Sequence, residues 1–389
     1  MAFRTAPDHS AETGTRTVHK RRRWLIAGSA VLVFLVAIAG TAFYFTGGYE
    51  KWRDERSLAG ACEGVLSKDD VRAALGSDRV HAQSGEKLNY IFSNLEKDRI
   101  TKCVLESRGS GENVVINAGW ATRDTDVRWH YAHLFLDEGG YGTVPIGSGW
   151  HGSLVFLRDS LQGAVELTCR NQKDKTLLVN FKTVHTGYNQ PQLDSQQRAD
   201  DRAGFARLVT STAGGLADKY GCDAPLGKTV GSVAPDPVRN PAPLDKSRGI
   251  CAPVVRLGGG AEQAGAVTAS DAPTDPTTPA EDCYLNNAKG YPLYRLTALY
   301  GGLAEKGRAE STWSDPAADA EFQERSHRGF GTAQCGDGKS AYYSLTAPYT
   351  SLEEGRTVKN PDPQFERAAL KAFAEQSAKT HGCHGLRLP

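Results

Sequence analysis

Eight cysteines constrain this chain more than any other feature, because all of them lie beyond residue 60 and fall into two sets of four. They are Cys62, Cys103, Cys169, Cys222, Cys251, Cys283, Cys335 and Cys383. Successive spacings are 41, 66 and 53 residues in the first set and 32, 52 and 48 in the second. An even number of this kind indicates a disulfide framework formed in an oxidising compartment. A zinc site is disfavoured, because no CxxC or HxxxH pair is present.

Pairing within each set is favoured, because a proline-rich segment between the sets would let each set fold separately. Four cysteines still allow three pairings. We favour bridges that tie the last strand of each set to its closing helix. The pairs are Cys62–Cys103, Cys169–Cys222, Cys251–Cys283 and Cys335–Cys383.

The residues around the cysteines also recur, which predicts an internal duplication. Cys62 and Cys251 each begin a C-x-x-V sequence followed by an aliphatic residue. At an offset of 180, an alternating apolar set recurs with the period of a strand. The two sets are Val114, Ile116, Ala118 and Trp120, then Tyr294, Leu296, Ala298 and Tyr300. Chance similarity of two small domains is the alternative.

The order of elements predicts an α+β fold, with antiparallel sheets and a closing helix in each of two duplicated domains. Ser67 can cap a short helix, with Asp70 reaching back and Gly76 ending it. We expect strands near 89–92, 101–106, 114–122, 153–156, 164–169 and 176–182. Closing helices are expected near 195–220 and 363–381. In the second copy, 257–279 is rich in Gly, Ala, Thr and Pro and is expected to be a loop.

An uncharged run of 22 residues, Trp24–Phe45, predicts a transmembrane helix. His19–Arg23 precedes it, so the N-terminus is expected in the cytoplasm and the bulk outside, in a single-pass protein of the cell membrane. A cleaved signal peptide is the first alternative. A lipoprotein signal ending at Cys62 is the second, but the charged stretch Glu50–Arg56 separates that cysteine from the run.

These features divide the chain into six expected segments. They are a basic tail (1–23), a transmembrane helix (24–46), a juxtamembrane segment (47–60), a first α+β repeat (61–223), a Pro-rich linker (224–248) and a second repeat (249–389). Beyond the tail, 40 basic residues face 43 acidic ones. Nucleic acid is therefore not an expected partner, since binding it needs a concentrated basic face.

No catalytic motif is evident, and we expect a non-enzymatic protein without a metal or cofactor. Gly147-Ser148-Gly149 suits a turn rather than a nucleophile elbow. His130 and His133 lack a third metal ligand. The candidate binding surface is aromatic, since such side chains suit the recognition of sugars or proteins, although core packing is the favoured reading. Its residues are Trp120, Trp129, Tyr131, Tyr141 and Trp150.

A basic tail, a single span and disulfide-stapled α+β repeats resemble uncharacterised single-pass envelope proteins of actinobacteria and their lipoprotein-type secreted domains. The resemblance covers the exterior loosely and implies no activity. We therefore expect a non-catalytic exported protein whose tandem domains bind a protein partner or a cell-wall ligand. An exported hydrolase acting on cell-wall material is the alternative.

Overall fold

The computed structural model describes most of the chain beyond residue 33. The described residues are 34–85, 99–108, 112–121, 142–157, 160–172, 175–185, 197–311, 320–336, 339–347, 358 and 360–389. They belong to two compact units, Met1–Arg56 and Ser57–Pro389. The basic tail (1–23) and the strand expected near 89–92 lie outside the described residues.

The expectation of a transmembrane helix over 24–46 is contradicted. Within the described part of the chain, no helix is both long and apolar enough to cross a membrane, and residues 24–33 lie outside that part. Residues 34–45 are helical and are followed by a turn in which Gly47 has a φ of +77°. The next helix, α2 (Gly48–Gly60), carries the charged stretch Glu50–Arg56. The described apolar helical residues 34–45 therefore form a segment shorter than the roughly 20 residues that a membrane span needs, and the turn at Gly47 separates them from the charged helix α2.

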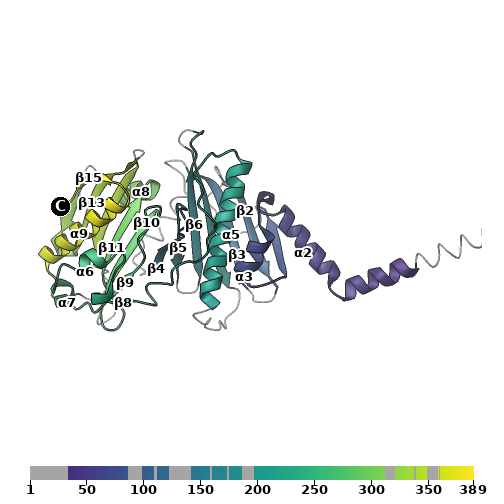
Figure 1. Cartoon of the computed structure of the whole chain (residues 1–389), viewed down its shortest axis with the longest axis horizontal. Helices are drawn as coiled ribbons and strands as arrows, with labels where there is room; N and C mark the ends of the chain where they lie inside the picture. Colours follow the sequence, from purple (N-terminus) through teal and green to yellow (C-terminus); the bar gives the residue numbers. More distant parts are fainter. Residues whose placement is uncertain are drawn as a thin grey trace, which may run out of the picture. The chain divides into compact units, whose positions relative to one another are not determined.

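The first module, residues 61–223, contains one antiparallel sheet of seven strands in the order β1-β2-β3-β7-β6-β5-β4. The strands are β1 (Val80–Ser84), β2 (Arg99–Ser107), β3 (Glu112–Ala121), β4 (Gly142–Pro145), β5 (Gly152–Phe156), β6 (Leu161–Thr168) and β7 (Thr176–His185). Its helices are η1 (Cys62–Gly64), α3 (Lys68–Leu75) and α5 (Gln197–Lys219). Figure 1 shows α5 lying along the strands of this sheet.

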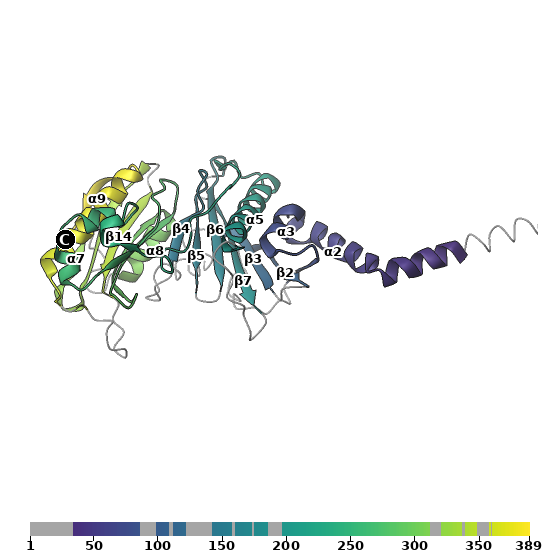
Figure 2. The ribbon, with the colours of Figure 1, turned by 60° about the horizontal axis from the view of Figure 1, so that its bottom comes forward.

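The second sheet is also antiparallel, in the order β12-β13-β14-β11-β10-β9-β8, with β15 pairing to β13. Its strands are β8 (Ala242–Pro243), β9 (Thr268–Asp271), β10 (Ala280–Asn286), β11 (Pro292–Tyr300), β12 (Glu321–Gln323), β13 (Arg328–Gln334), β14 (Ser340–Thr346) and β15 (His384–Arg387). Its helices are η2 (Leu244–Lys246), α6 (Ala252–Val255), α7 (Gly260–Gln263), α8 (Gly302–Ser311), η3 (Glu324–Ser326) and α9 (Pro363–Thr380). All but β8 and η2 lie in the second module, residues 249–389. Figure 2 shows α8 and α9 on opposite sides of β14.

The two modules share one strand order. Running β1-β2-β3-β7-β6-β5 along the first sheet corresponds to β9-β10-β11-β14-β13-β12 along the second. The register agrees as well, since Cys103 lies opposite Ile116 and Cys283 lies opposite Leu296. Residues related in this way are called equivalent below.

The closing helices end alike. The amide of Cys222 donates to the carbonyl of Ala217, and the amide of Cys383 donates to the carbonyl of Ala378, each at 2.8 Å. The glycine before each cysteine has a positive φ, +62° at Gly221 and +64° at Gly382. Both ends therefore have the left-handed glycine that such helix termini favour.

The predicted disulfide pairing is confirmed. The four bridges are Cys62–Cys103, Cys169–Cys222, Cys251–Cys283 and Cys335–Cys383. In each module one bridge joins the opening segment to the second strand of the shared strand order, which is β2 in the first module and β10 in the second. The other bridge joins the end of a strand to the closing helix. All eight cysteines are bridged, so none is a free thiol.

Local helix signals were predictive in the first module but not at the start of the second. The Ser67 side chain accepts a hydrogen bond from the amide of Asp70 at 3.3 Å, and Gly76 ends α3 in a left-handed conformation. In the second module, 257–279 is not the expected loop, because it contains α7 and β9. Backbone pairing of β9 to β10 stabilises a strand that its Gly- and Thr-rich surroundings did not indicate.

Candidate functional site

Two of the five aromatic residues of the candidate binding surface, Trp120 and Trp150, lie among the described residues. Their surroundings differ. Trp129, Tyr131 and Tyr141 lie outside the described residues. Trp150 is only 6% exposed, and its indole Nε1 donates to the carbonyl of Lys228 at 2.8 Å. Gly227 lies against its ring, so a larger residue there would overlap it. Trp150 therefore packs the segment after α5 onto the first module.

Trp120 is different, because it is half-buried at the end of β3. Its ring meets the ring of Tyr220 edge to face at 6.3 Å, and the Lys175 ammonium lies 5.0 Å from its centre. Tyr220 donates to the Glu63 carboxylate at 3.2 Å, which Lys219 also contacts at 2.9 Å. The hydrogen bond from Lys219 lowers the pKa of Glu63. The result is an aromatic pair set among charges at one end of the first sheet.

The second module places an equivalent group at the same end of its sheet. Tyr300 is equivalent to Trp120, His381 to Tyr220, and Lys339 to Lys175. The His381 ring stacks on the Tyr300 ring at 3.7 Å. The turns that carry the two lysines also match. The amide of Cys169 donates to the carbonyl of Lys175, and the amide of Cys335 donates to the carbonyl of Lys339.

A buried carboxylate joins this second group. Glu281 accepts a hydrogen bond from the Ser377 hydroxyl, which is also bonded to the Tyr300 hydroxyl. The other Glu281 oxygen lies 3.2 Å from His381 Nε2. Burial, followed by the charge of Glu281, raises the pKa of Tyr300 well above its ordinary value. The serine therefore bonds to the carboxylate and not to the imidazole, unlike the serine of a hydrolytic triad.

The same end of the second module contacts the first module through buried polar groups. Thr143 Oγ1 donates to Asp282 Oδ2 at 2.8 Å, and Ser153 and Thr278 share a hydrogen bond of 2.9 Å. Thr277 donates to the carbonyl of Trp150 at 3.0 Å. These bonds join the β4–β5 hairpin to the start of β10, and we call them the module junction.

Asp282 is the centre of this junction. Its other oxygen accepts from Arg295 Nε at 2.9 Å and from Thr297 Oγ1 at 2.7 Å. The Asp282 side chain has no exposed area, and that of Arg295 is 5% exposed. A buried ion pair needs such additional hydrogen bonds to offset its desolvation, and one of them comes from the first module.

His151 lies beside Trp150 in the hairpin, and its protonation is disfavoured. Burial is the largest cause, and the charges of Lys339 and His381 act in the same direction. Together they lower the pKa of His151 to about 4. At neutral pH the junction therefore holds a neutral imidazole facing two basic side chains.

A second buried carboxylate lies near the other end of α9. Glu366 is fully buried and accepts from the Tyr294 hydroxyl at 2.9 Å. His327 Nδ1 lies 3.0 Å from the same carboxylate, and the His327 side chain is 28% exposed. The equivalent positions in the first module hold Phe205, Val114 and Leu161, which are apolar. The second module thus has titratable groups where the first module has apolar residues.

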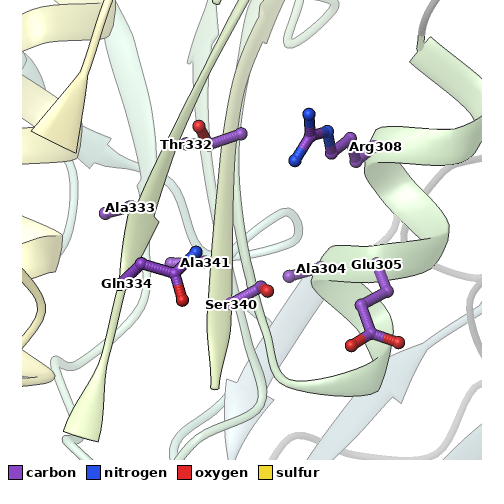
Figure 3. Close-up of a pocket in the computed structure, with 8 residues that line it drawn as sticks. All are labelled: Ala304, Glu305, Arg308, Thr332, Ala333, Gln334, Ser340 and Ala341. Atoms are coloured by element: carbon purple, nitrogen blue, oxygen red, sulfur yellow. The ribbon is translucent and has the colours of Figure 1, made fainter. Parts of the chain in front are cut away.

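A small pocket with both polar and apolar lining lies on the opposite face of the second sheet. It has a volume of about 150 Å³ and lies between α8 and the paired strands β13 and β14. Glu305 and Arg308 line it from α8, while Thr332, Gln334 and Ser340 line it from the strands (Figure 3).

Metal ligands do not gather among the described residues, where no group of three or more His, Cys, Asp or Glu side chains could hold an ion. His130 and His133 lie outside those residues. Gly147-Ser148-Gly149 forms a turn, in which all three residues have positive φ values.

No family model, curated protein or solved structure matches this chain. Its function must therefore be argued from its own residues.

Sequence reasoning missed the two buried carboxylate groups and the pocket. Glu281 and Ser377 are 96 positions apart, and Tyr294 and Glu366 are 72 apart, so no local motif marks them. One signal was available. Aligning the two repeats places Glu366 opposite Phe205, and a charged residue at a predicted core position would have identified the site.

Proposed function

We propose that this chain is an exported, non-catalytic binding protein whose two modules act as one unit toward a protein partner. Four disulfides favour an oxidising compartment. The module junction favours a single body, because its hydrogen bonds are buried and would leave unpaired polar groups if the modules separated.

One observation carries the proposal of a binding surface. In the second module, the end that bears Tyr300, His381 and Lys339 faces the first module. The charges of Lys339 and His381 lie close enough to His151 of the first module to lower its pKa. The equivalent end of the first module bears Trp120 and Tyr220, which are half-buried, and Lys175, which is exposed. In the second module this end of the sheet therefore contacts another part of the protein. In the first module the equivalent end carries partly exposed aromatic side chains that could make a similar contact with a partner.

The chemistry of that end suits a protein partner. Trp and Tyr contribute strongly to binding energy at interfaces, because they bury a large apolar area and keep a polar edge. Lys175 and the pair Glu63–Lys219 would form a polar rim around them.

Photo-crosslinking in intact producing cells tests this proposal. A photoreactive residue replacing Lys175 should capture a discrete exported protein, and Trp120→Ala should abolish that product. The matched control places the same residue at Lys371, an exposed position of α9. Absence of a product at position 175, or equal products at both positions, would contradict the proposal.

An exported hydrolase is the second candidate, and the carboxylate–histidine pairs are the observation in its favour. The His327–Glu366 pair is the more accessible of the two, because its imidazole is partly exposed. Hydrolysis of cell-wall material that His327→Gln abolishes would favour this candidate over the first.

A further inference from the structure

The pocket beneath α8 is formed by fixed backbone. The amide of Gly301 donates to the carbonyl of Ser340 at 2.9 Å, which holds the start of α8 against the start of β14. Further along, a Cβ atom on Gly307 would lie 2.9 Å from side-chain atoms of both Leu299 and Tyr342. Only glycine lets the helix approach the sheet this closely. The wall and floor of the pocket are therefore held at two points.

The wall carries opposite charges. Glu305 and Arg308 are three residues apart on α8, so their side chains leave the same face of the helix. Figure 3 shows Arg308 extending toward the strand of Thr332, while Glu305 lies toward the end occupied by Ser340. A ligand in the pocket would thus meet a positive group at one end and a negative group at the other.

The floor supplies neutral hydrogen-bonding groups. Thr332 and Ser340 have hydroxyls that donate and accept, and Gln334 has an amide that does both. Gln334 pairs with Ser340 across β13 and β14, so their side chains leave the sheet on the same side. Ala304 adds a small side chain from α8, whereas Ala333 and Ala341 alternate with the floor residues and face the core on the other side of the sheet.

Size limits the ligand. A volume of about 150 Å³ matches that of an engineered protein cavity that accepts a six-atom ring such as benzene. A molecule of about six non-hydrogen atoms therefore fits this space.

We propose that this pocket binds a small zwitterion, namely an α-amino acid with a small side chain. Its carboxylate would lie against the Arg308 guanidinium, whose five N–H donors can serve a ligand beside another contact. Its ammonium group would lie against Glu305, with the hydroxyls and the amide of the floor completing its hydrogen bonds. This site goes beyond the partner-binding function proposed above and lies on a different module from Trp120, so either proposal can fail alone.

Calorimetric titration of the full chain with alanine tests the proposal. Saturable binding is expected below about 10 mM, a range that suits a ligand with few contacts. N-acetylalanine and alaninamide, which each lack one of the two charges, should bind at least about tenfold more weakly.

Variants locate the site. Arg308→Gln and Glu305→Gln should each weaken alanine binding at least about tenfold. Ser340→Ala gives an independent floor variant with a smaller effect in the same direction. Lys371→Gln, on the exposed face of α9, is the matched control and should bind like the wild type. Thermal melting checks that each variant is folded.

Three results would overturn the proposal. They are no saturable binding of alanine to the wild type, equal binding of alanine and its two blocked derivatives, and folded Arg308→Gln and Glu305→Gln proteins that bind alanine normally.

Discussion

Thr143 donates a 2.8 Å hydrogen bond to Asp282, joining two side chains that are 139 positions apart. This bond joins the β4–β5 hairpin of the first module to strand β10 of the second module. It makes the ion pair of Asp282 and Arg295 depend on a residue from the first module.

Replacing Thr143 by Val should destabilise the unit Ser57–Pro389. The change keeps the shape of the side chain but removes a hydrogen bond to a buried carboxylate. Such a bond contributes about 1.5–3 kcal/mol, so the free energy of unfolding in urea should fall by about that amount. Thr143→Ser keeps the hydroxyl and should lose much less. Equal losses for the two variants would show that the bond contributes little.

The free energy of unfolding should fall as the pH is lowered from about 6.5 to about 4, because the pKa of His151 is lower in the folded chain than in the unfolded chain. Its folded pKa of about 4 lies below its ordinary value of 6.5, so the unfolded chain binds a proton more readily. Stability from the neutral imidazole is therefore complete above about pH 6.5 and lost toward pH 4. The loss is at most about 3–4 kcal/mol, at about 1.4 kcal/mol per pKa unit.

Urea unfolding at pH 7.5, 5.5 and 4.0 measures this dependence. His151→Gln cannot be protonated and should flatten the part of the curve between pH 6.5 and 4. The groups that face His151 are Lys339 and His381, and His381 is bonded to Glu281. A wild-type curve that the substitution leaves unchanged would assign the pH dependence to other groups.

The buried group around Glu366 should be replaceable as a set but not singly. His327→Leu leaves the carboxylate with Tyr294 alone, and should cost about 1–3 kcal/mol of unfolding free energy. The triple variant His327→Leu, Glu366→Leu and Tyr294→Phe imitates the apolar packing of the first module. It should be as stable as the wild type or more so, because replacing buried charges together avoids an unpaired one.

Chemical denaturation of the single and triple variants decides this point. A triple variant less stable than His327→Leu would mean that the second module cannot accept the apolar packing of the first.

The two strand-to-helix bridges should contribute equally. Cys169–Cys222 closes 53 residues and Cys335–Cys383 closes 48. Chain entropy gives about 4 kcal/mol for either loop, because its dependence on length is logarithmic. The double variants Cys169→Ala with Cys222→Ala, and Cys335→Ala with Cys383→Ala, should therefore lose similar free energies of unfolding. A large difference would indicate that strain or residual structure outweighs chain entropy.

Much of the fold followed from local sequence. The alternation at Val114, Ile116 and Ala118 predicted β3, and the glycines before Cys222 and Cys383 predicted the ends of α5 and α9. These signals are short in range, since strand alternation and helix capping depend on residues a few positions apart.

Long-range features were not predictable in the same way. Trp150 was a candidate surface residue for which core packing was the favoured reading, and it is buried, with Gly227, 77 positions later, leaving room for its ring. The apolar run over 24–46 was expected to cross a membrane, yet no helix among the described residues is long and apolar enough to do so. The packing of Trp150 depends on a residue far along the chain, which local sequence signals do not report.

The bridges also determine how the chain would respond to a pulling force. Each bridge closes a loop that cannot lengthen while the covalent bond holds, so force would bypass residues 62–103, 169–222, 251–283 and 335–383. Only the stretches between these loops can extend, at roughly 3.3–3.6 Å per residue. Stretched from both ends, this protein would lengthen only through its unbridged stretches, with both closing helices shielded from the load.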